Sequence, residues 1–356
     1  MITNSKKPII LDCTLRDGSY VIDFQFTKED TLNIASNLCE AGFKYIEVGH
    51  GVGLGASKRG FDVAAATDEE YCEATATAVG EKAKWGMFCI PGIATLEDLE
   101  MAIDFGMDFV RIGTDINKVN ESEKFINLAK KKGLEVFANF MKSYVLSPTE
   151  FASLVNKSHH FGADGIYLVD SAGGMLPSQV RSFIKESYNL NPEFVLGFHG
   201  HNNMGLGMAN ALVSIEEGVT YIDSTLQGFG RSSGNVSAEQ LVCMLDLLGL
   251  NDSFDPIKIM DLGETLIRPL ITQRGLSSLD LTAGWAQFHS SFMPLILKVA
   301  KEERVDPRLL ISEVCKIDRI TTSVEHLKSI AATLNNGDSI YSNLKAWPLY
   351  FGEEEL

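Results

Sequence analysis

The sequence predicts a (β/α)8 TIM barrel followed by a segment made only of helices. Three observations support this fold class. Short apolar, β-branched runs alternate with amphipathic stretches of about 10 to 20 residues. Eight such repeats occupy about 240 residues, which matches the strand number and the length of a (β/α)8 barrel. After about Leu250 the alternation stops, and only the period of helices continues.

Each strand is predicted where a short apolar run precedes polar residues or a turn. In chain order the predicted strands are residues 9–13, 45–49, 84–90, 109–113, 135–140, 165–170, 195–201 and 221–225. A helix is predicted over residues 27–41, because Thr27 and Asp30 resemble a capping box and Gly42 provides a C-terminal stop. A doubly wound sheet is the alternative, but no G-x-G-x-x-G turn follows the first strand.

Four helices are predicted after the barrel, and prolines mark their boundaries. They cover residues 257–268, 281–301, 306–317 and 322–334. Pro256, Pro269 and Pro307 lie near the ends of these stretches, where proline begins or ends helices. We therefore expect a catalytic barrel at residues 1–250, a helical C-terminal domain at 251–345 that completes the active site, and an acidic tail at 346–356.

The composition is that of an ordinary globular protein. Of the 356 residues, 45% are apolar and 22% are charged, which excludes collagen, coiled coil and general disorder. The net charge of −16 argues against a nucleic-acid partner, because phosphate binding needs clustered Lys and Arg. No window approaches the ~20 apolar residues of a membrane span, and the apolar run after Lys7 is too short for a signal peptide. We expect a cytoplasmic protein without a membrane partner, and the six scattered cysteines predict no disulfide framework.

Polar residues gather at the ends of several predicted strands, where barrel enzymes place their catalytic groups. His199 and His201 are two residues apart on the seventh strand, so their side chains share a face. Two imidazoles and a carboxylate can hold a divalent cation and leave positions open for substrate. Asp17, just after the first strand, can supply the carboxylate, although the spacing alone also fits ordinary hydrogen-bonded histidines.

Two segments, Leu11-Asp-Cys-Thr-Leu-Arg-Asp-Gly and Phe198-His-Gly-His-Asn-Asn, resemble the signature pair of the DRE-TIM metallolyase superfamily. Within that superfamily, four further stretches resemble the 4-hydroxy-2-oxovalerate aldolase family. They are EVGHGVGLG at 47–55, PGIAT at 91–95, VDSAGGMLP at 169–177 and GFGRSSGN at 228–235. The resemblance covers about residues 9–334 and includes GWAQFHSSF at 284–292, which is similar to the stretch that lends the family an active-site residue.

The resemblance implies a lyase that cleaves a 4-hydroxy-2-oxo acid to pyruvate and an aldehyde with a divalent metal, Mn²⁺ before Mg²⁺ or Co²⁺. The implied metal ligands are Asp17, His199 and His201, with Asn235 supporting the metal shell. The metal would polarise the keto group of the 2-oxo acid as a Lewis acid. Arg16 would stabilise the charge of the pyruvate enolate, while Ser171 and nearby backbone amides would hold the carboxylate.

Two residues are exchanged relative to the family. The family places His where Tyr20 stands and Tyr where His289 stands. Cleavage requires a group that takes the proton of the 4-hydroxyl, and histidine suits neutral pH better than tyrosine. We therefore predict that His289 takes this proton while Tyr20 orients the hydroxyl. The alternative is that His289 only packs the helical segment against the barrel.

Three further residues are candidate substrate contacts. Lys142 follows the fifth strand, and Arg231 replaces a small residue of the family in the loop after the eighth strand. Both can bind an additional anionic group of the substrate, although a solvated loop lysine is the alternative for Lys142. His50 lies among the glycines of the second loop, where it can contact substrate or form a loop-bridging hydrogen bond.

A Claisen-type synthase joining an acyl-CoA to a 2-oxo acid is the nearest alternative, because HNNMGL at 201–206 resembles the H-N-D-L-G-L of the synthase branch. The chain lacks the Glu-Gln that follows R-D-G in synthases. A Schiff-base aldolase using Lys142 is disfavoured, because such lysines sit on strands in desolvated pockets. A non-catalytic barrel that docks a partner is the remaining alternative. In the family the helical segment contacts an acylating aldehyde dehydrogenase, a partner that the sequence leaves open, and we expect a homo-oligomer.

Overall fold

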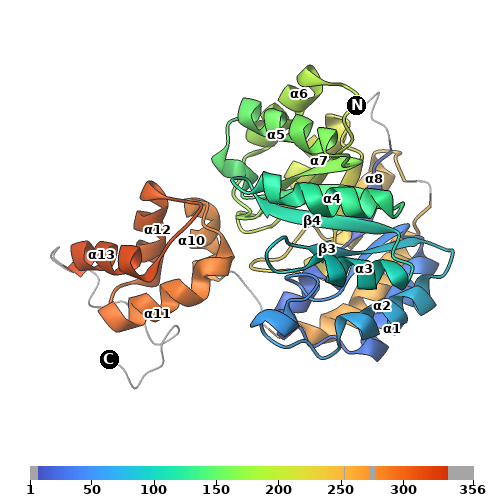
Figure 1. Cartoon of the computed structure of the whole chain (residues 1–356), viewed down its shortest axis with the longest axis horizontal. Coiled ribbons are helices and arrows are strands. Elements are labelled where there is room, and N and C mark those ends of the chain that lie inside the picture. The colour runs from blue at the N-terminus through green and yellow to red at the C-terminus, as the bar shows by residue number, and fades with distance from the viewer. Residues whose placement is uncertain (1–6, 252, 273–276, 336–356) are drawn as a thin grey trace.

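Eight parallel strands close into a barrel in chain order, with β1 paired to both β2 and β8. Figure 1 shows the barrel from the side, with helices around its strands. The computed structural model describes residues 7–251, 253–272 and 277–335. The strands are β1 (Ile9–Asp12), β2 (Tyr45–Val48), β3 (Lys84–Cys89), β4 (Phe109–Asp115), β5 (Glu135–Met141), β6 (Gly165–Asp170), β7 (Leu196–Gly200) and β8 (Tyr221–Ser224). The predicted fold class is confirmed, and every strand boundary lies within two residues of its predicted position.

Helices α1 to α8 alternate with the strands and surround the barrel. They are α1 (Lys28–Ala41), α2 (Asp68–Val79), α3 (Leu96–Asp104), α4 (Glu123–Lys131), α5 (Pro148–His160), α6 (Pro177–Leu190), α7 (Gly207–Glu216) and α8 (Ala238–Leu247). The capping box predicted at Thr27 and Asp30 is present, so side chains satisfy the first free backbone groups of α1. Gly42 ends α1 with a φ of 106°, a left-handed conformation that favours glycine.

An aromatic floor fills the lower part of the barrel interior. Its rings belong to Tyr45, Phe109, Phe137, Tyr167 and Tyr221, with neighbouring centroids 4.9 to 6.4 Å apart. Side chains two residues farther along a strand point to the same face. A buried polar layer therefore lies directly above the floor, toward the carboxyl ends of the strands. It contains Glu47, Arg111, Asn139, His199 and Asp223.

The chain after the barrel divides between two hydrophobic clusters. Helix α9 (Pro256–Leu262) continues into a π-helical turn and a 3-10 turn, and its buried residues belong to the large cluster around the barrel. The remaining helices are α10 (Ser278–Ala286), α11 (Met293–Glu303), α12 (Pro307–Ile317) and α13 (Val324–Asn335). These four form a helical bundle beside the barrel, with its own core of residues such as Ile296, Leu310 and Leu327 (Figure 1).

The prediction of one helix over residues 281–301 is wrong. Helix α10 ends at Ala286. The next residue, Gln287, has a left-handed φ of 55°, and a 3-10 turn at Ser290–Phe292 precedes α11. Pro294 cannot stand in a helix interior without losing a backbone hydrogen bond, but it fits the first turn of α11. The break matters for function, because it turns residues 289–292 toward the mouth of the barrel.

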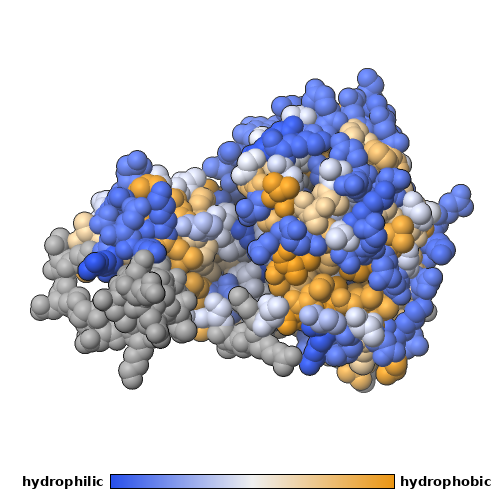
Figure 2. All heavy atoms as spheres, turned by 90° about the horizontal axis from the view of Figure 1, so that it is seen from below, coloured by the Kyte–Doolittle hydropathy of each residue, from blue (hydrophilic) through white to orange (hydrophobic). Residues whose placement is uncertain are grey.

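The other predicted helices of this segment are close to the observed ones, except that the second half of the 257–268 stretch is π-helical and 3-10. Residues 336–345 and the acidic tail at 346–356 lie outside the described residues. None of the helices in the described part of the chain is both long and apolar enough to cross a bilayer. Seen from below the view of Figure 1, apolar residues gather on the barrel beside the bundle (Figure 2).

Candidate active site

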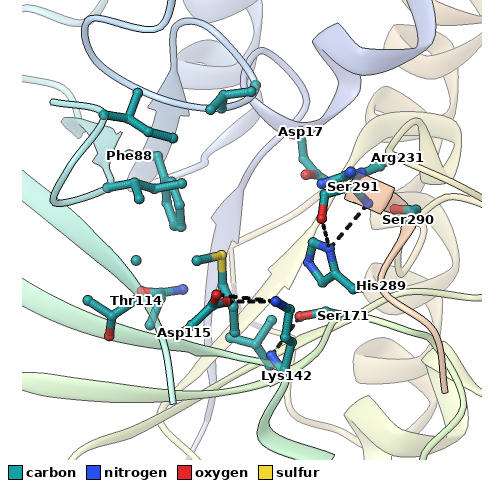
Figure 3. Close-up of a pocket in the computed structure, with 18 of the residues that line it drawn as sticks. Asp17, Phe88, Thr114, Asp115, Lys142, Ser171, Arg231, His289, Ser290 and Ser291 are labelled. Atoms are coloured by element: carbon teal, nitrogen blue, oxygen red, sulfur yellow. Dashed lines mark hydrogen bonds and ion pairs between the residues drawn. The ribbon is translucent and has the colours of Figure 1, made fainter. Parts of the chain in front are cut away.

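A cavity of about 660 Å³ opens at the carboxyl ends of the barrel strands and is covered in part by residues 289–292 of the bundle. Nine of the eleven predicted site residues line it, namely Arg16, Asp17, Tyr20, Lys142, Ser171, His199, His201, Arg231 and His289. They come from both sides of the barrel and from the bundle, and several of them face one another across the cavity (Figure 3). The lining also includes apolar residues, among them Phe88, Ile90 and Pro91.

The predicted metal ligands converge at the base of this cavity. Asp17, His199 and His201 are buried, and one ligand atom from each lies within 4.8 Å of the others. The Nδ1 atom of His199 is 2.7 Å from Asp223 Oδ2, so its Nε2 atom is free to bind a cation. A carboxylate on the outer nitrogen of a histidine is the usual second partner of a metal ligand.

Two unpaired buried atoms indicate that a cation fits here. His201 Nδ1 and Asn235 Oδ1 have no hydrogen-bond partner among the described residues, and an unpaired buried polar atom is costly. The Nδ2 atom of Asn235 donates to Asp17 Oδ2 at 2.6 Å, which holds this amide beside the carboxylate. The donor set of two imidazoles and a carboxylate, with an amide oxygen nearby, suits a divalent metal.

The protonation states of these ligands favour the same conclusion. Burial lowers the pKa of His201 to about 4, although the Asp17 carboxylate opposes this shift, so the ring is neutral at pH 7. Burial alone would raise the pKa of Asp17, but Arg16 and then the two histidines hold it well below its usual range. A neutral imidazole and an ionised carboxylate are the forms that bind metals.

A fully buried network connects the metal ligands to Arg16. Arg111 Nη2 lies 2.5 Å from Asp223 Oδ2, the oxygen that also contacts His199, and Arg111 Nη1 lies 3.0 Å from Glu47 Oε2. The same Glu47 oxygen accepts from Arg16 Nε at 2.7 Å. The sequence reasoning missed Arg111 and Asp223. The pattern that could have revealed them is a polar residue two positions after an aromatic residue on an otherwise apolar strand. Phe109 and Arg111 show this pattern.

Comparison with known proteins identifies the family. The sequence profile of the family described as HMGL-like matches residues 7–266. The chain belongs to the HMGL-like family. The family predicted from the two signature segments is thereby confirmed, and the metal cluster lies inside the matched region.

Named relatives of this HMGL-like chain are aldolases. It is 35% identical to the 4-hydroxy-2-oxovalerate aldolase of Carboxydothermus hydrogenoformans over 335 residues, which cover 94% of this chain and 99% of that protein. It is 37% identical to 4-hydroxy-2-oxovalerate aldolase 2 of Rhodococcus jostii over 314 residues, or 87% of this chain and 90% of that protein. Both matches extend into the helical bundle, beyond the region matched by the family profile.

Solved structures share the fold of this HMGL-like protein. The N-terminal domain of a proposed aldolase from Bacteroides vulgatus superposes with a TM-score of 0.66 at 26% identity, covering 81% of this chain and 96% of that domain. The carboxyl transferase domain of Rhizobium etli pyruvate carboxylase gives a TM-score of 0.75 at 15% identity, covering 94% of this chain and 61% of that one. At such low identity the second match shows the fold alone.

His50 has a structural position in the HMGL-like barrel. Its Nε2 atom is 2.8 Å from the carbonyl oxygen of Asp62, its Nδ1 atom accepts from the backbone of Val52, and its ring stacks on Phe24 at 4.0 Å. It does not line the cavity. These contacts are those of the loop-bridging alternative, so we do not retain His50 as a substrate contact.

Ser171 lines the cavity, but its surroundings differ from the prediction in one respect. Its Oγ atom accepts from the backbone N–H of Lys142 at 3.1 Å. Backbone amides near Ser171 are predicted to help hold the substrate carboxylate, but two amides of this loop, those of Gly174 and Met175, donate to the Asp170 side chain at 3.2 and 2.9 Å. The hydroxyl of Ser171 therefore remains as the candidate contact on this loop.

Lys142 is buried rather than solvated, being 3% exposed. Its Nζ atom forms an ion pair with Asp115 at 3.2 Å (Figure 3). The same atom donates to the carbonyl oxygen of Ile320 at 2.9 Å. The same atom lies 5.0 Å from the centre of the Phe292 ring. Phe292 and Ile320 belong to the segment that forms the bundle. Lys142 therefore connects the barrel to the bundle at the edge of the cavity.

Replacement of Lys142 by methionine is therefore expected to loosen the bundle. A buried charged hydrogen bond is worth about 1.5 to 3 kcal/mol, so hydrogen exchange should accelerate at residues 287–292 and 318–322 while metal affinity stays unchanged. Hydrogen-exchange mass spectrometry measures this, with Lys316→Met as a matched control because Lys316 is an exposed residue of α12. If hydrogen exchange at residues 287–292 is unchanged in Lys142→Met, Lys142 does not hold the bundle against the barrel.

His289, Tyr20 and Arg231 lie around one end of the cavity. The backbone N–H of Ser291 donates to His289 Nδ1 at 3.2 Å, so the neutral ring carries its proton on Nε2. The Ser291 hydroxyl is 2.6 Å from the same Nδ1 atom (Figure 3). Burial, followed by the nearby charges of Arg231 and Lys142, lowers the pKa of His289 well below its usual value. The ring is thus a neutral acceptor at pH 7.

Tyr20 lines the same cavity as a neutral phenol. Burial raises the pKa of Tyr20, although Arg231 opposes the shift. A Cβ atom on Gly51 would come within 2.7 Å of the Tyr20 ring, so this position of the second loop requires glycine. The arrangement fixes the phenol as a hydrogen-bond donor at the cavity wall.

Proposed function

We propose that this HMGL-like protein is a divalent-metal-dependent aldolase that cleaves a 4-hydroxy-2-oxo acid to pyruvate and an aldehyde. One observation carries the proposal. A single cavity brings together a three-residue metal cluster, the Arg16 guanidinium and a buried neutral histidine. Relatives named 4-hydroxy-2-oxovalerate aldolase, matched over most of both chains, support the same reaction.

Asp17, His199 and His201 would hold the metal, and Asn235 would support the shell. When bound, a divalent metal supplies Lewis-acid polarisation of the 2-oxo group. We propose Mn²⁺ as this metal. Titration of the protein with Mn²⁺, Mg²⁺ and Co²⁺ in parallel tests this proposal. The Ser171 hydroxyl faces the same cavity and is the proposed contact for the substrate carboxylate.

Arg16 is placed to stabilise the charge that develops on pyruvate. Its Nη1 atom contacts Asp17 at 2.6 Å and its Nε atom contacts Glu47 at 2.7 Å, so the guanidinium is fixed beside the metal ligands. It also lies over the Phe88 ring, 4.9 Å from its centre. Because these contacts exist before substrate binds, no reorganisation is needed when the enolate forms.

Bond cleavage requires one proton acceptor. As the bond between C3 and C4 breaks, the 4-hydroxyl loses its proton and C4 becomes the aldehyde carbonyl, while the bonding electrons pass to C3 and form the pyruvate enolate. The exposed hydroxyl of Ser291 can take the substrate proton and pass its own to His289 Nδ1. Tyr20 donates a hydrogen bond that orients the reacting hydroxyl. Water then protonates the enolate at C3 to give pyruvate, and the proton held by His289 neutralises the hydroxide that is formed.

Replacement of His289 by alanine is expected to lower the cleavage rate by ~10²-fold or more. The base must be unprotonated to act, so activity falls as pH falls through its pKa. Because the pKa of His289 is lowered, the acidic limb of the kcat/KM profile should lie below 6.5 in the parent enzyme and disappear in the variant. Steady-state kinetics across pH, with bound metal measured in parallel, checks both effects.

The Ser291→Ala variant distinguishes the proposed role of Ser291, which relays the proton, from that of His289, which is the base. It should reduce kcat less than His289→Ala does and should retain the acidic limb. If the folded, metal-loaded His289→Ala variant keeps both its rate and its acidic limb, His289 has no catalytic role.

The decisive test of the reaction is pyruvate release from a panel of 4-hydroxy-2-oxo acids, with and without Mn²⁺. The same protein incubated with acetyl-CoA and 2-oxo acids tests the Claisen-type synthase, which its named relatives do not favour. A lack of metal binding and of 2-oxo acid binding would instead support a barrel that only docks a partner.

The acylating aldehyde dehydrogenase partner, the homo-oligomer and the cytoplasmic location stay predictions. The bundle exposes large apolar side chains, with Trp285 at 69% and Ile317 at 68% exposure. Sedimentation analysis of the protein alone and with an acylating aldehyde dehydrogenase tests the first two predictions.

A further inference from the structure

Among the described residues, one half-buried cation that lines the cavity has no carboxylate as an ion-pair partner. Four basic side chains line the cavity, namely Arg16, Lys118, Lys142 and Arg231. Arg16 is paired with Asp17 and Glu47, and Lys142 is paired with Asp115. Lys118 is exposed at the rim. Arg231 is half-buried, and no carboxylate in the described part of the chain forms an ion pair with it.

Arg231 is held in place by an aromatic ring rather than by an acid. Its Cζ atom lies 4.7 Å from the centre of the Tyr20 ring. Stacking occupies one face of the planar guanidinium and leaves its edge, which carries the N–H donors, available for a ligand. Carboxylates and phosphates match this edge in a bidentate manner.

The loop that carries Arg231 is fixed on both sides. The Arg231 carbonyl accepts from Gly234 at 3.1 Å. The neighbouring Ser232 has a left-handed φ of 59°, accepts from Asn203 and donates to Asp280 of α10, both at 2.7 Å. A guanidinium presented from such a loop loses little conformational freedom when it binds an anion.

The position of Arg231 indicates which half of the substrate it faces. Figure 3 shows Arg231 beside Ser291 and His289, the residues proposed to receive the proton of the 4-hydroxyl, and also near Asp17. The pyruvate half is directed toward Arg16 and the metal ligands. With the 4-hydroxyl at Ser291, groups attached beyond C4, which become part of the aldehyde, are within reach of Arg231.

We infer that Arg231 binds a second anionic group, a carboxylate or a phosphate, on the aldehyde half of the substrate. The inference rests on the proposed aldolase function and makes the released aldehyde an anion. Lys142 does not share this role, because its ammonium group already forms an ion pair with Asp115 and a hydrogen bond to the carbonyl oxygen of Ile320.

Cleavage of three substrates of matched length tests the inference. They are 4-hydroxy-2-oxo acids whose far end is a methyl group, a carboxylate or a phosphate. We expect the parent enzyme to prefer at least one anionic substrate over the methyl one by about 10- to 100-fold in kcat/KM. Arg231→Gln should reduce that preference to nearly one, and Arg231→Lys should retain part of it. Arg268→Gln, at an exposed arginine that does not line the cavity, is the control that should preserve it.

Equal kcat/KM for the three substrates in the parent enzyme, or an unchanged preference in Arg231→Gln, would overturn the inference. The better of the two anionic substrates identifies the carboxylate or the phosphate as the natural group.

A binding experiment keeps this test separate from the proposed reaction. Calorimetry compares 2-oxoheptanedioate with 2-oxoheptanoate, which lack the 4-hydroxyl and cannot be cleaved. The diacid should bind more tightly by about 10-fold or more, and Arg231→Gln should remove the difference. An enzyme that shows this difference but cleaves nothing would contradict the aldolase proposal and support the anion site. Equal affinities for the two acids would contradict the anion site whatever the enzyme cleaves.

Discussion

Replacement of His199 by alanine is expected to abolish cleavage and to weaken Mn²⁺ binding by more than ~10²-fold. Loss of a partner that only contacts a metal ligand typically costs 10- to 100-fold in affinity, so loss of a ligand should cost more. The fold should survive, because Asp223 keeps its contact with Arg111 when the imidazole is removed. Titration of the purified variant with Mn²⁺ measures the affinity independently of activity.

Two further variants serve as comparisons for His199→Ala. Asp223→Asn leaves all three proposed ligands in place and should lower Mn²⁺ affinity only by about 10- to 100-fold. His160→Ala removes an exposed histidine of α5 and should change neither affinity nor rate. A His199→Ala, His201→Ala double variant that still binds one equivalent of Mn²⁺ with unchanged affinity would place the metal elsewhere.

Replacement of Arg16 by lysine should lower kcat by about 10²-fold or more while KM changes little. The charge of the enolate develops only as the bond breaks, so a group that stabilises it acts on the transition state and not on bound substrate. A lysine keeps the positive charge but loses the planar fork that reaches Asp17 and Glu47 together. Steady-state kinetics with the preferred substrate separates kcat from KM.

Metal content must be measured in the same variant, because Arg16 also contacts the ligand Asp17. We expect the metal to remain bound, since the Asn235 amide still holds that carboxylate. Arg268→Lys is the matched control at an exposed position in the 3-10 turn after α9. A metal-loaded Arg16→Lys enzyme with nearly normal kcat would remove Arg16 from the mechanism.

Local patterns were sufficient to predict the barrel and its strands. Apolar runs and capping residues act over a few positions, so the helix start at Thr27 and the strand over Gly165–Asp170 are visible in the sequence. His199 and His201 were predictable for the same reason, because a spacing of two on a strand fixes a shared face.

Contacts between distant segments could not be predicted in this way. The partner of His199 is Asp223 on the next strand, and only the closed barrel brings Arg111 from β4 to the same carboxylate. The burial of Lys142 depends on the bundle, since Ile320 lies 178 residues farther along the chain. The prediction of a single helix over 281–301 was wrong, because apolar residues keep a helical spacing through the break between α10 and α11. Gln287 and Pro294 mark this break.

The separate hydrophobic cores of the barrel and the bundle divide the site into two parts that can fail independently. The barrel carries all the proposed metal ligands, whereas His289 and Ser291 come from the bundle. A shift of about 1 Å in a reacting group can cost ~10²-fold in rate. Preparations with a full complement of Mn²⁺ can therefore differ widely in specific activity, and the fraction of competent enzyme has to be counted by active-site titration rather than by metal analysis.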